Sequence, residues 1–191
     1  KRGPEVDPAG QLVHWLFAMG DMLPANLTRT IAVLAGHPLQ LAEVRADPSG
    51  EFLAGCIQDT MRLWPTTSLF GRVTESDVRF KNGELVPAGT QVLIHNLFNH
   101  RNRERVPYAD RFAPEEWVSG DAASSWSFNF FSNGPQGCPG AGLSIFLGQA
   151  FLGRLLTAAD PVVEAGPKLK PGKPLPYGVD LGSLKISLRP R

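Results

Sequence analysis

The chain has 191 residues, of which 42% are hydrophobic, and its formal net charge is +1. This length and composition suit one sizeable folded domain and exclude disorder along the whole chain, while the small net charge gives no general attraction to nucleic acid or acidic membranes. The two cysteines, Cys56 and Cys138, do not make a disulfide framework, and the four histidines show no zinc-like spacing with them. We find no apolar run long enough to span a bilayer and no signal peptide, so we expect a soluble, cytoplasmic protein.

The first predicted element is a long helix from Gln11 to Pro38. Its residues are mostly apolar without the alternation of a strand, and Gly36 and Pro38 are good stop signals. Pro24 in its interior lacks a backbone N–H. We therefore predict a buried helix with a kink at this proline and with Asp21 beside the kink.

Two shorter helices are predicted over residues 39–47 and 50–64. Cys56 lies within the second, where we interpret it as a buried structural thiol. Asp59 and Arg62 in the same helix are three residues apart on one face and can pair. From their spacing alone, this is a surface ion pair worth about 0.3–0.5 kcal/mol.

Between residues 68 and 95 the pattern changes to that of strands. The segment 78–80 and the extended run that ends with 87–94 indicate strands around a hairpin, with Asn82 and Gly83 at the turn.

The remaining part of the chain contains a coil, a helix and a tail. Residues 99–125 are polar and proline-bearing but too aromatic for a flexible linker, so we expect an ordered coil. Residues 141–158 predict a strong, apolar helix, and the tail suggests one more hairpin with its turn near Gly182. The sequence therefore predicts a mixed fold, mainly α with small β-sheets.

The segment FSNGPQGCPG, residues 131–140, places Cys138 among glycine and proline directly before the last predicted helix. Pro139 suits the first position of a helix, so the thiol would lie at a helix N-terminus, where the helix dipole favours a thiolate. Gly134 and Gly140 allow tight turns and a close approach of the backbone to a flat ligand. These features alone leave two readings equally open, a turn cysteine and a cysteine that binds a metal or an electrophile.

The same segment resembles the haem-binding loop of the cytochrome P-450 family. It matches the family pattern at Phe131, Gly134, Cys138 and Gly140, and departs from it at Gln136, where the family usually has Arg or His to hold a haem propionate. The resemblance implies a haem b (iron protoporphyrin IX) cofactor with Cys138 as the axial ligand of its iron. The other four residues are then expected to form the cofactor-binding loop.

Other segments carry the same resemblance. Asp59 and Arg62 stand where the family has its Glu-x-x-Arg helix, and Glu116 stands at the arginine position of the meander that follows. The resemblance implies a cluster in which Arg62 lies between two acids, Asp59 and Glu116, and locks helix to meander. It also places Arg72 where the family often supplies a partner for a haem propionate.

The long helix resembles the family's oxygen-side helix, which usually carries an acid–alcohol pair for proton delivery. Counting back from His37 and Pro38 places Asp21 at the acid position and Met22 at the alcohol position. Asp21 is therefore a candidate catalytic residue, and a buried, paired carboxylate is the alternative. Met22 has no hydroxyl and cannot relay a proton.

The resemblance covers essentially the whole chain but only about the C-terminal half of the family's usual length. We therefore expect residues 1–191 to be a single partial domain, the haem-binding part of a longer protein of actinobacterial-like, bacterial type. The missing N-terminal half, or another chain, would complete its pocket.

The implied function is that of a haem-thiolate monooxygenase. Such an enzyme oxidises a small organic substrate with oxygen and with electrons from a ferredoxin-type or other donor. Two alternatives stay open. Met22 favours altered chemistry, such as peroxide use, rearrangement or coupling, whereas Met22, Gln136 and Glu116 together favour a non-catalytic haem-binding or interaction domain.

Overall fold

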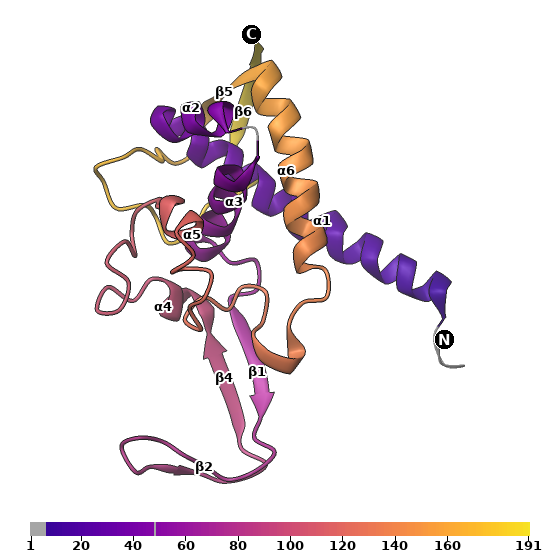
Figure 1. Ribbon diagram of the computed structural model, residues 1–191, viewed down its shortest axis with the longest axis vertical. Coiled ribbons are helices and arrows are strands. Elements are labelled where there is room, and N and C mark those ends of the chain that lie inside the picture. Colours follow the sequence, from indigo (N-terminus) through magenta and orange to yellow (C-terminus); the bar gives the residue numbers. More distant parts are fainter. Residues whose placement is uncertain (1–6, 48) are drawn as a thin grey trace.

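The computed structural model describes residues 7–47 and 49–191. Within them the chain is mainly helical with three two-stranded sheets, which confirms the mixed, mainly α fold (Figure 1). The helices are α1 (Pro8–Gly36), α2 (Pro38–Ala46), α3 (Glu51–Leu63), α4 (Asn96–His100), α5 (Glu115–Val118) and α6 (Ala141–Ala158), with a 3-10 turn at Gly134–Gln136. The strands are β1 (Leu69–Val73), β2 (Val78–Arg79), β3 (Leu85–Val86), β4 (Gln91–His95), β5 (Ala159–Ala165) and β6 (Lys185–Pro190).

The long helix α1 forms as predicted but is only partly buried. The Asp7 carboxylate caps it by accepting a hydrogen bond from the Ala9 N–H at 3.0 Å, and the helix continues through Pro24. Its N-terminal half extends past α6 in Figure 1, and most side chains there are exposed. The predicted burial therefore holds for the second half alone, and Asp21 is exposed.

The core lies around α3, which packs against α1, α5 and α6. Cys56 is fully buried in this core, as predicted, and burial raises the pKa of its thiol well above the usual value. Gly148 of α6 allows close packing here, because a Cβ at this position would lie 2.9 Å from Cδ1 of Ile57 and 3.1 Å from Cδ2 of Leu27. This close packing positions α6, and the loop that precedes it, relative to α1 and α3.

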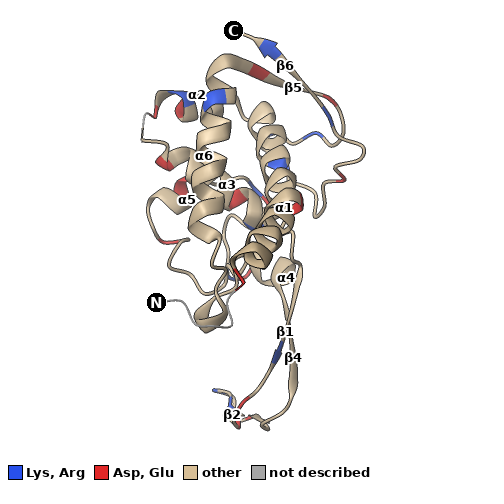
Figure 2. Cartoon of the chain, turned by 90° about the vertical axis from the view of Figure 1, so that its right-hand side faces the viewer, with Lys and Arg blue, Asp and Glu red and all other residues tan. Residues whose placement is uncertain are grey.

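The helix α6 corrects the expectation that the chain has no apolar run long enough to span a bilayer. Its 18 residues have a mean hydropathy of 1.3, and by length and composition alone they could cross a membrane. Figure 2 shows the helix almost free of charge, and Arg154 is its one charged residue. Length and composition of a single helix are weak evidence for a membrane span, so this finding alone assigns no membrane, although only 17% of the helix is buried in the described structure.

The strands pair differently from the simple hairpin expected. The turn at Gly83, with φ of 88°, joins β2 to β3 as predicted. The run after it is broken, however, and its second part, β4, pairs with β1 in an antiparallel ladder that aligns Phe70 with Ile94. These two strands project away from the helices in Figure 1.

The predicted tail hairpin with a turn near Gly182 is wrong in its pairing. A turn does form there, where the Gly182 N–H donates to the Asp180 carboxylate. The strand β6, however, pairs with β5, which directly follows α6. Residues 167–184 between them include prolines, which cannot donate to a ladder, and form no strand.

Candidate functional site

A cavity of about 610 Å³ lies between α1, β1 and the loop that contains Cys138. Its wall includes Ala18, Met19, Met22, Leu23 and Asn26 of α1, Phe70 and Arg72 of β1, and Phe131, Ser132, Gln136, Cys138 and Gly140 of the loop. Several predicted site residues therefore meet in one place. Asp21 and Gly134 are not among the wall residues.

The loop presents the Cys138 thiol on the cavity wall. Cys138 is exposed, and its backbone N–H donates to the Phe131 carbonyl at 2.7 Å, which closes the loop. Gly134 has a φ of 78° at the start of the 3-10 turn, a conformation that favours glycine. A Cβ at Gly140 would lie in ordinary van der Waals contact with the Cys138 sulfur at 3.8 Å, so the glycine keeps the backbone beside the thiol bare.

The limits predicted from the apolar pattern, residues 141–158, agree with α6, whereas the expectation that Pro139 takes the first helical position is wrong. The helix α6 begins at Ala141 with Gly140 as its N-cap, rather than at Pro139. The Cys138 carbonyl accepts a hydrogen bond from the Ala141 N–H at 3.2 Å. The thiol therefore belongs to the turn just before the helix N-terminus.

Arg72 is the one Lys or Arg side chain on the described part of the cavity wall. Its Nη2 donates to Oγ of Ser132 at 2.5 Å, and its Nη1 donates to the Gly71 carbonyl at 2.8 Å. Ser132 holds this position with a φ of 59°, which is unusual for a residue other than glycine. Gln136 lies on the same wall and adds no charge, so Arg72 is the guanidinium available there to an acidic group.

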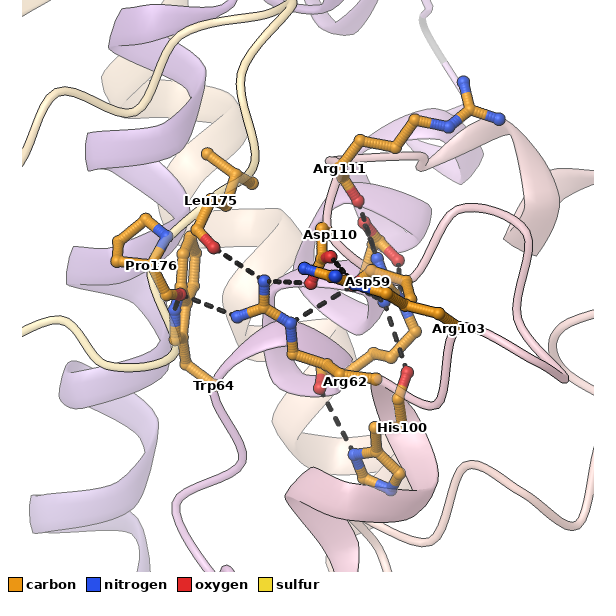
Figure 3. Close-up of polar contacts among 11 residues, drawn as sticks. Asp59, Arg62, Trp64, His100, Arg103, Asp110, Arg111, Leu175 and Pro176 are labelled. Atoms are coloured by element: carbon orange, nitrogen blue, oxygen red, sulfur yellow. Dashed lines mark hydrogen bonds and ion pairs between the residues drawn. The ribbon is translucent and has the colours of Figure 1, made fainter.

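The ion pair of Asp59 and Arg62 is fully buried, not a surface pair. Both side chains are 0% exposed, and two hydrogen bonds of 2.5 and 3.2 Å join the guanidinium to the carboxylate (Figure 3). Arg62 also donates to the carbonyls of Ala109 at 3.0 Å and Arg111 at 2.8 Å. It thereby holds α3 against the ordered coil.

The prediction that Glu116 joins Asp59 and Arg62 in this cluster is wrong. Glu116 is only half-buried and forms no ion pair with Arg62 among the described residues. Asp59 instead accepts hydrogen bonds from the Ala113 N–H at 2.8 Å and from the Trp117 indole N–H at 3.0 Å. A second carboxylate facing Asp59 would repel it, whereas these two neutral donors complete its hydrogen bonding.

A chain of hydrogen bonds that the sequence did not indicate links α3 to the cysteine loop. Nδ1 of His100 lies 3.2 Å from the Arg62 carbonyl, and Nε2 accepts from the Asn129 N–H at 2.8 Å. The ring is therefore neutral with its proton on Nδ1, and burial lowers its pKa from 6.5 to about 4. The Asn129 side chain in turn accepts from the Asn133 N–H at 2.5 Å, inside the loop.

The two α1 residues predicted at the acid and alcohol positions, Asp21 and Met22, lie in different surroundings. Met22 lies on the cavity wall, whereas Asp21 is exposed and does not line it. The alternative of a buried, paired carboxylate at Asp21 is wrong for this structure, and its catalytic role stays a prediction. The buried polar residue on the α1 wall is Asn26, which the sequence reasoning missed because an isolated asparagine in an apolar helix gives no motif.

The residues of the cavity fit the haem that the resemblance implies. The exposed thiol of Cys138 can bind iron, the bare backbone at Gly140 leaves room beside it, and Arg72 can face an acidic edge. The cavity volume lies within the range of cofactor and ligand pockets.

Comparison with known proteins points to one family. The model of the family described as Cytochrome P-450 matches residues 49–173. The chain is 33% identical over 107 residues to Cytochrome P-450 4c3 of Drosophila melanogaster, covering 55% of this chain and 20% of that protein. It is 31% identical over 128 residues to cyclooctat-9-en-7-ol 5-monooxygenase of Streptomyces melanosporofaciens, covering 59% and 28%. It is 28% identical over 154 residues to Cytochrome P-450 3A16 of Mus musculus, covering 71% and 30%. The chain thus spans less than a third of the length of these three relatives.

Proposed function

Because the chain belongs to the cytochrome P-450 family, we propose that it is the haem-binding part of a haem-thiolate monooxygenase with Cys138 as the iron ligand. One observation supports this most strongly. Of the two thiols, Cys56 is sealed in the core, whereas Cys138 is exposed on the wall of the cavity. An exposed thiol of this kind is suited to a soft metal centre, which supports Cys138 as the proposed iron ligand.

Each residue around Cys138 has a different role in holding the proposed cofactor. Haem b bound through a cysteine thiolate supplies oxygen activation, because the thiolate favours cleavage of the O–O bond. Gly140 leaves space beside the sulfur, and Phe131 contributes an aromatic ring to the wall. Arg72, positioned by Ser132, binds a propionate, while Gln136 offers a neutral hydrogen bond where the family usually has a cation.

The rest of the wall favours a small organic substrate that is mostly apolar. Met19, Met22 and Leu23 of α1 and Phe70 of β1 face the cavity. We propose that a segment outside residues 1–191, or another chain, covers the remaining side, and that a ferredoxin-type or other donor supplies electrons. The cytoplasmic location is part of the same proposal.

A second candidate is a haem-thiolate enzyme that uses peroxide. Met22 on the cavity wall and the exposure of Asp21 favour it, because neither residue places an acid or alcohol at the cavity in this structure. Hydrogen peroxide already contains the two electrons and two protons that oxygen would have to receive, so a reaction with peroxide requires less proton delivery from the helix.

Turnover by the intact, haem-loaded protein separates these functions. We expect oxygen consumption and an oxidised product when substrate and an electron donor are both present. Turnover with peroxide but not with oxygen and electrons would favour the second candidate. Bound haem without turnover under either condition would contradict both and support a non-catalytic domain.

A further inference from the structure

The wall of the cavity contains a buried acceptor without a hydrogen-bond partner. Asn26 is 4% exposed and lines the cavity. Its Nδ2 donates to the Met22 carbonyl at 3.0 Å, whereas its Oδ1 has no partner among the described residues. A buried acceptor left unpaired loses its hydration without compensation, so an atom of this kind indicates a bound water or ligand.

The hydrogen bond to Met22 fixes which end of the amide is which. With the amide reversed, Oδ1 would face the Met22 carbonyl oxygen, and two acceptors would oppose each other. The unpartnered atom is therefore the oxygen. Because the terminal torsion of asparagine has a broad minimum, rotation of the amide about it is the movement that would bring the shielded Oδ1 to a donor in the cavity.

The neighbouring wall of α1 offers no other group for this purpose. From residue 18 to residue 23 its wall residues are Ala18, Met19, Met22 and Leu23, none of which has a hydroxyl or amide in its side chain. Asn26 lies four residues beyond Met22, so both occupy the same helix face. Among the wall residues of α1 from residue 18 to residue 26, Asn26 is thus the one with a polar side chain.

We propose that Asn26 is a hydroxyl-binding site of the cavity, where Oδ1 accepts a hydrogen bond from the O–H of a bound water or of the substrate. This assignment rests on the proposed function, because it takes the cavity to be the place where a substrate is oxidised. Asn26 acts as a positioning residue. It holds a hydroxyl beside Met22 and gives up no proton itself.

The test uses the intact, haem-loaded protein and two probes of similar shape, cyclohexanol and cyclohexane. Their binding is followed through the Soret band in the wild type, in Asn26→Leu and in the control Thr30→Val. Thr30→Val removes a buried hydroxyl of α1 that donates to the Asn26 carbonyl at 2.9 Å and does not line the cavity. If the substrate supplies the O–H, Asn26→Leu weakens cyclohexanol binding by about 3- to 10-fold, the equivalent of one neutral hydrogen bond, and leaves cyclohexane binding unchanged.

If a water supplies the O–H, a different readout responds. The C–O stretching frequency of the reduced protein with carbon monoxide then shifts in Asn26→Leu and stays constant in Thr30→Val. Should Asn26→Leu fail to fold, Asn26→Ser replaces it, because serine can still donate to the Met22 carbonyl but its shorter side chain has no amide oxygen.

Two negative results have different meanings. Unchanged affinities for both probes together with an unchanged stretching frequency overturn the assignment of Asn26 and leave the proposed function intact. Loss of the thiolate-type Soret band in the wild type overturns the proposed function, and the assignment with it.

Discussion

Arg62 is the residue on which the polar contacts of the interior converge. It binds the Asp59 carboxylate and two carbonyls of the coil, and all of its side chain is shielded from water. Removing it would leave the Asp59 charge buried without its cation, which is the costly way to break such a pair.

We expect Arg62→Ala to lower the free energy of unfolding on the order of 3–5 kcal/mol. Urea unfolding followed by circular dichroism measures the loss. Arg103→Ala is the control, because Arg103 pairs with Asp110 at the surface and is 69% exposed. A loss below about 1 kcal/mol for Arg62→Ala would show that the pair contributes no more than a surface one.

The meander acts on Asp59 through Trp117 rather than through Glu116. Trp117→Phe removes the indole N–H that donates to Asp59 and should cost about 1–3 kcal/mol in the same unfolding experiment. Glu116→Gln should change stability by less than about 0.5 kcal/mol. The reverse order of the two effects would restore the predicted acid–arginine–acid cluster.

At the level of elements, His100 joins three parts of the fold. It links α3, through the Arg62 carbonyl, to the segment that leads through Asn129 into the cysteine loop. A proton added to Nε2 would destroy its role as an acceptor. Charging His100 therefore opposes both its burial and the attachment of the loop.

This link makes stability depend on pH. The pKa of His100 is lowered from 6.5 to about 4, so between these values the unfolded chain binds a proton that the folded chain does not. The stability that neutral His100 contributes is fully present above pH 6.5 and is lost as the pH falls toward 4. The total loss in the free energy of unfolding is about 3 kcal/mol.

Unfolding free energies of the wild type and of His100→Gln between pH 4 and pH 7 test this contribution. The wild type should lose more stability than the variant across the window, and His95→Gln, which changes an exposed histidine, should follow the wild type. Parallel curves for the wild type and His100→Gln would contradict the assigned link.

Local patterns explain which elements the sequence predicts well. The limits of α6 agree because a mostly apolar run, broken only by single polar residues, begins directly after the glycine-rich loop and ends before Asp160 and Pro161. The partner of β4 was not predictable, because pairing is a contact between distant segments that depends on the packing of the whole chain. The residues of the site show the same contrast between local patterns and contacts made by the folded chain. Cys138 and Arg72 were found through a local pattern, whereas Asn26 and His100 gained their significance from burial.

At the scale of the whole molecule, α1 and α6 expose large apolar side chains. Phe17 of α1 is 74% exposed, and Phe146 and Phe151 of α6 are 63% and 56% exposed. Figure 2 shows how few charges interrupt these two helices. Apolar surface of this extent promotes association.

We expect the 191-residue chain to associate as its concentration rises, and Phe146→Glu to reduce this association. Sedimentation velocity over a concentration series measures the effect. Thr157→Glu places the same charge at another exposed position of α6 and should leave association unchanged. Equal effects of both substitutions would mean that net charge, and not the apolar face, controls association.

The absorption spectrum of the reduced protein with carbon monoxide tests whether Cys138 provides the thiolate for haem iron. We expect a red-shifted Soret band of the thiolate type in the wild type and in Cys56→Ala, which alters only the buried thiol. Cys138→Ser should lose this band while haem is still retained. A thiolate-type band that persists in Cys138→Ser would rule out Cys138 as the iron ligand.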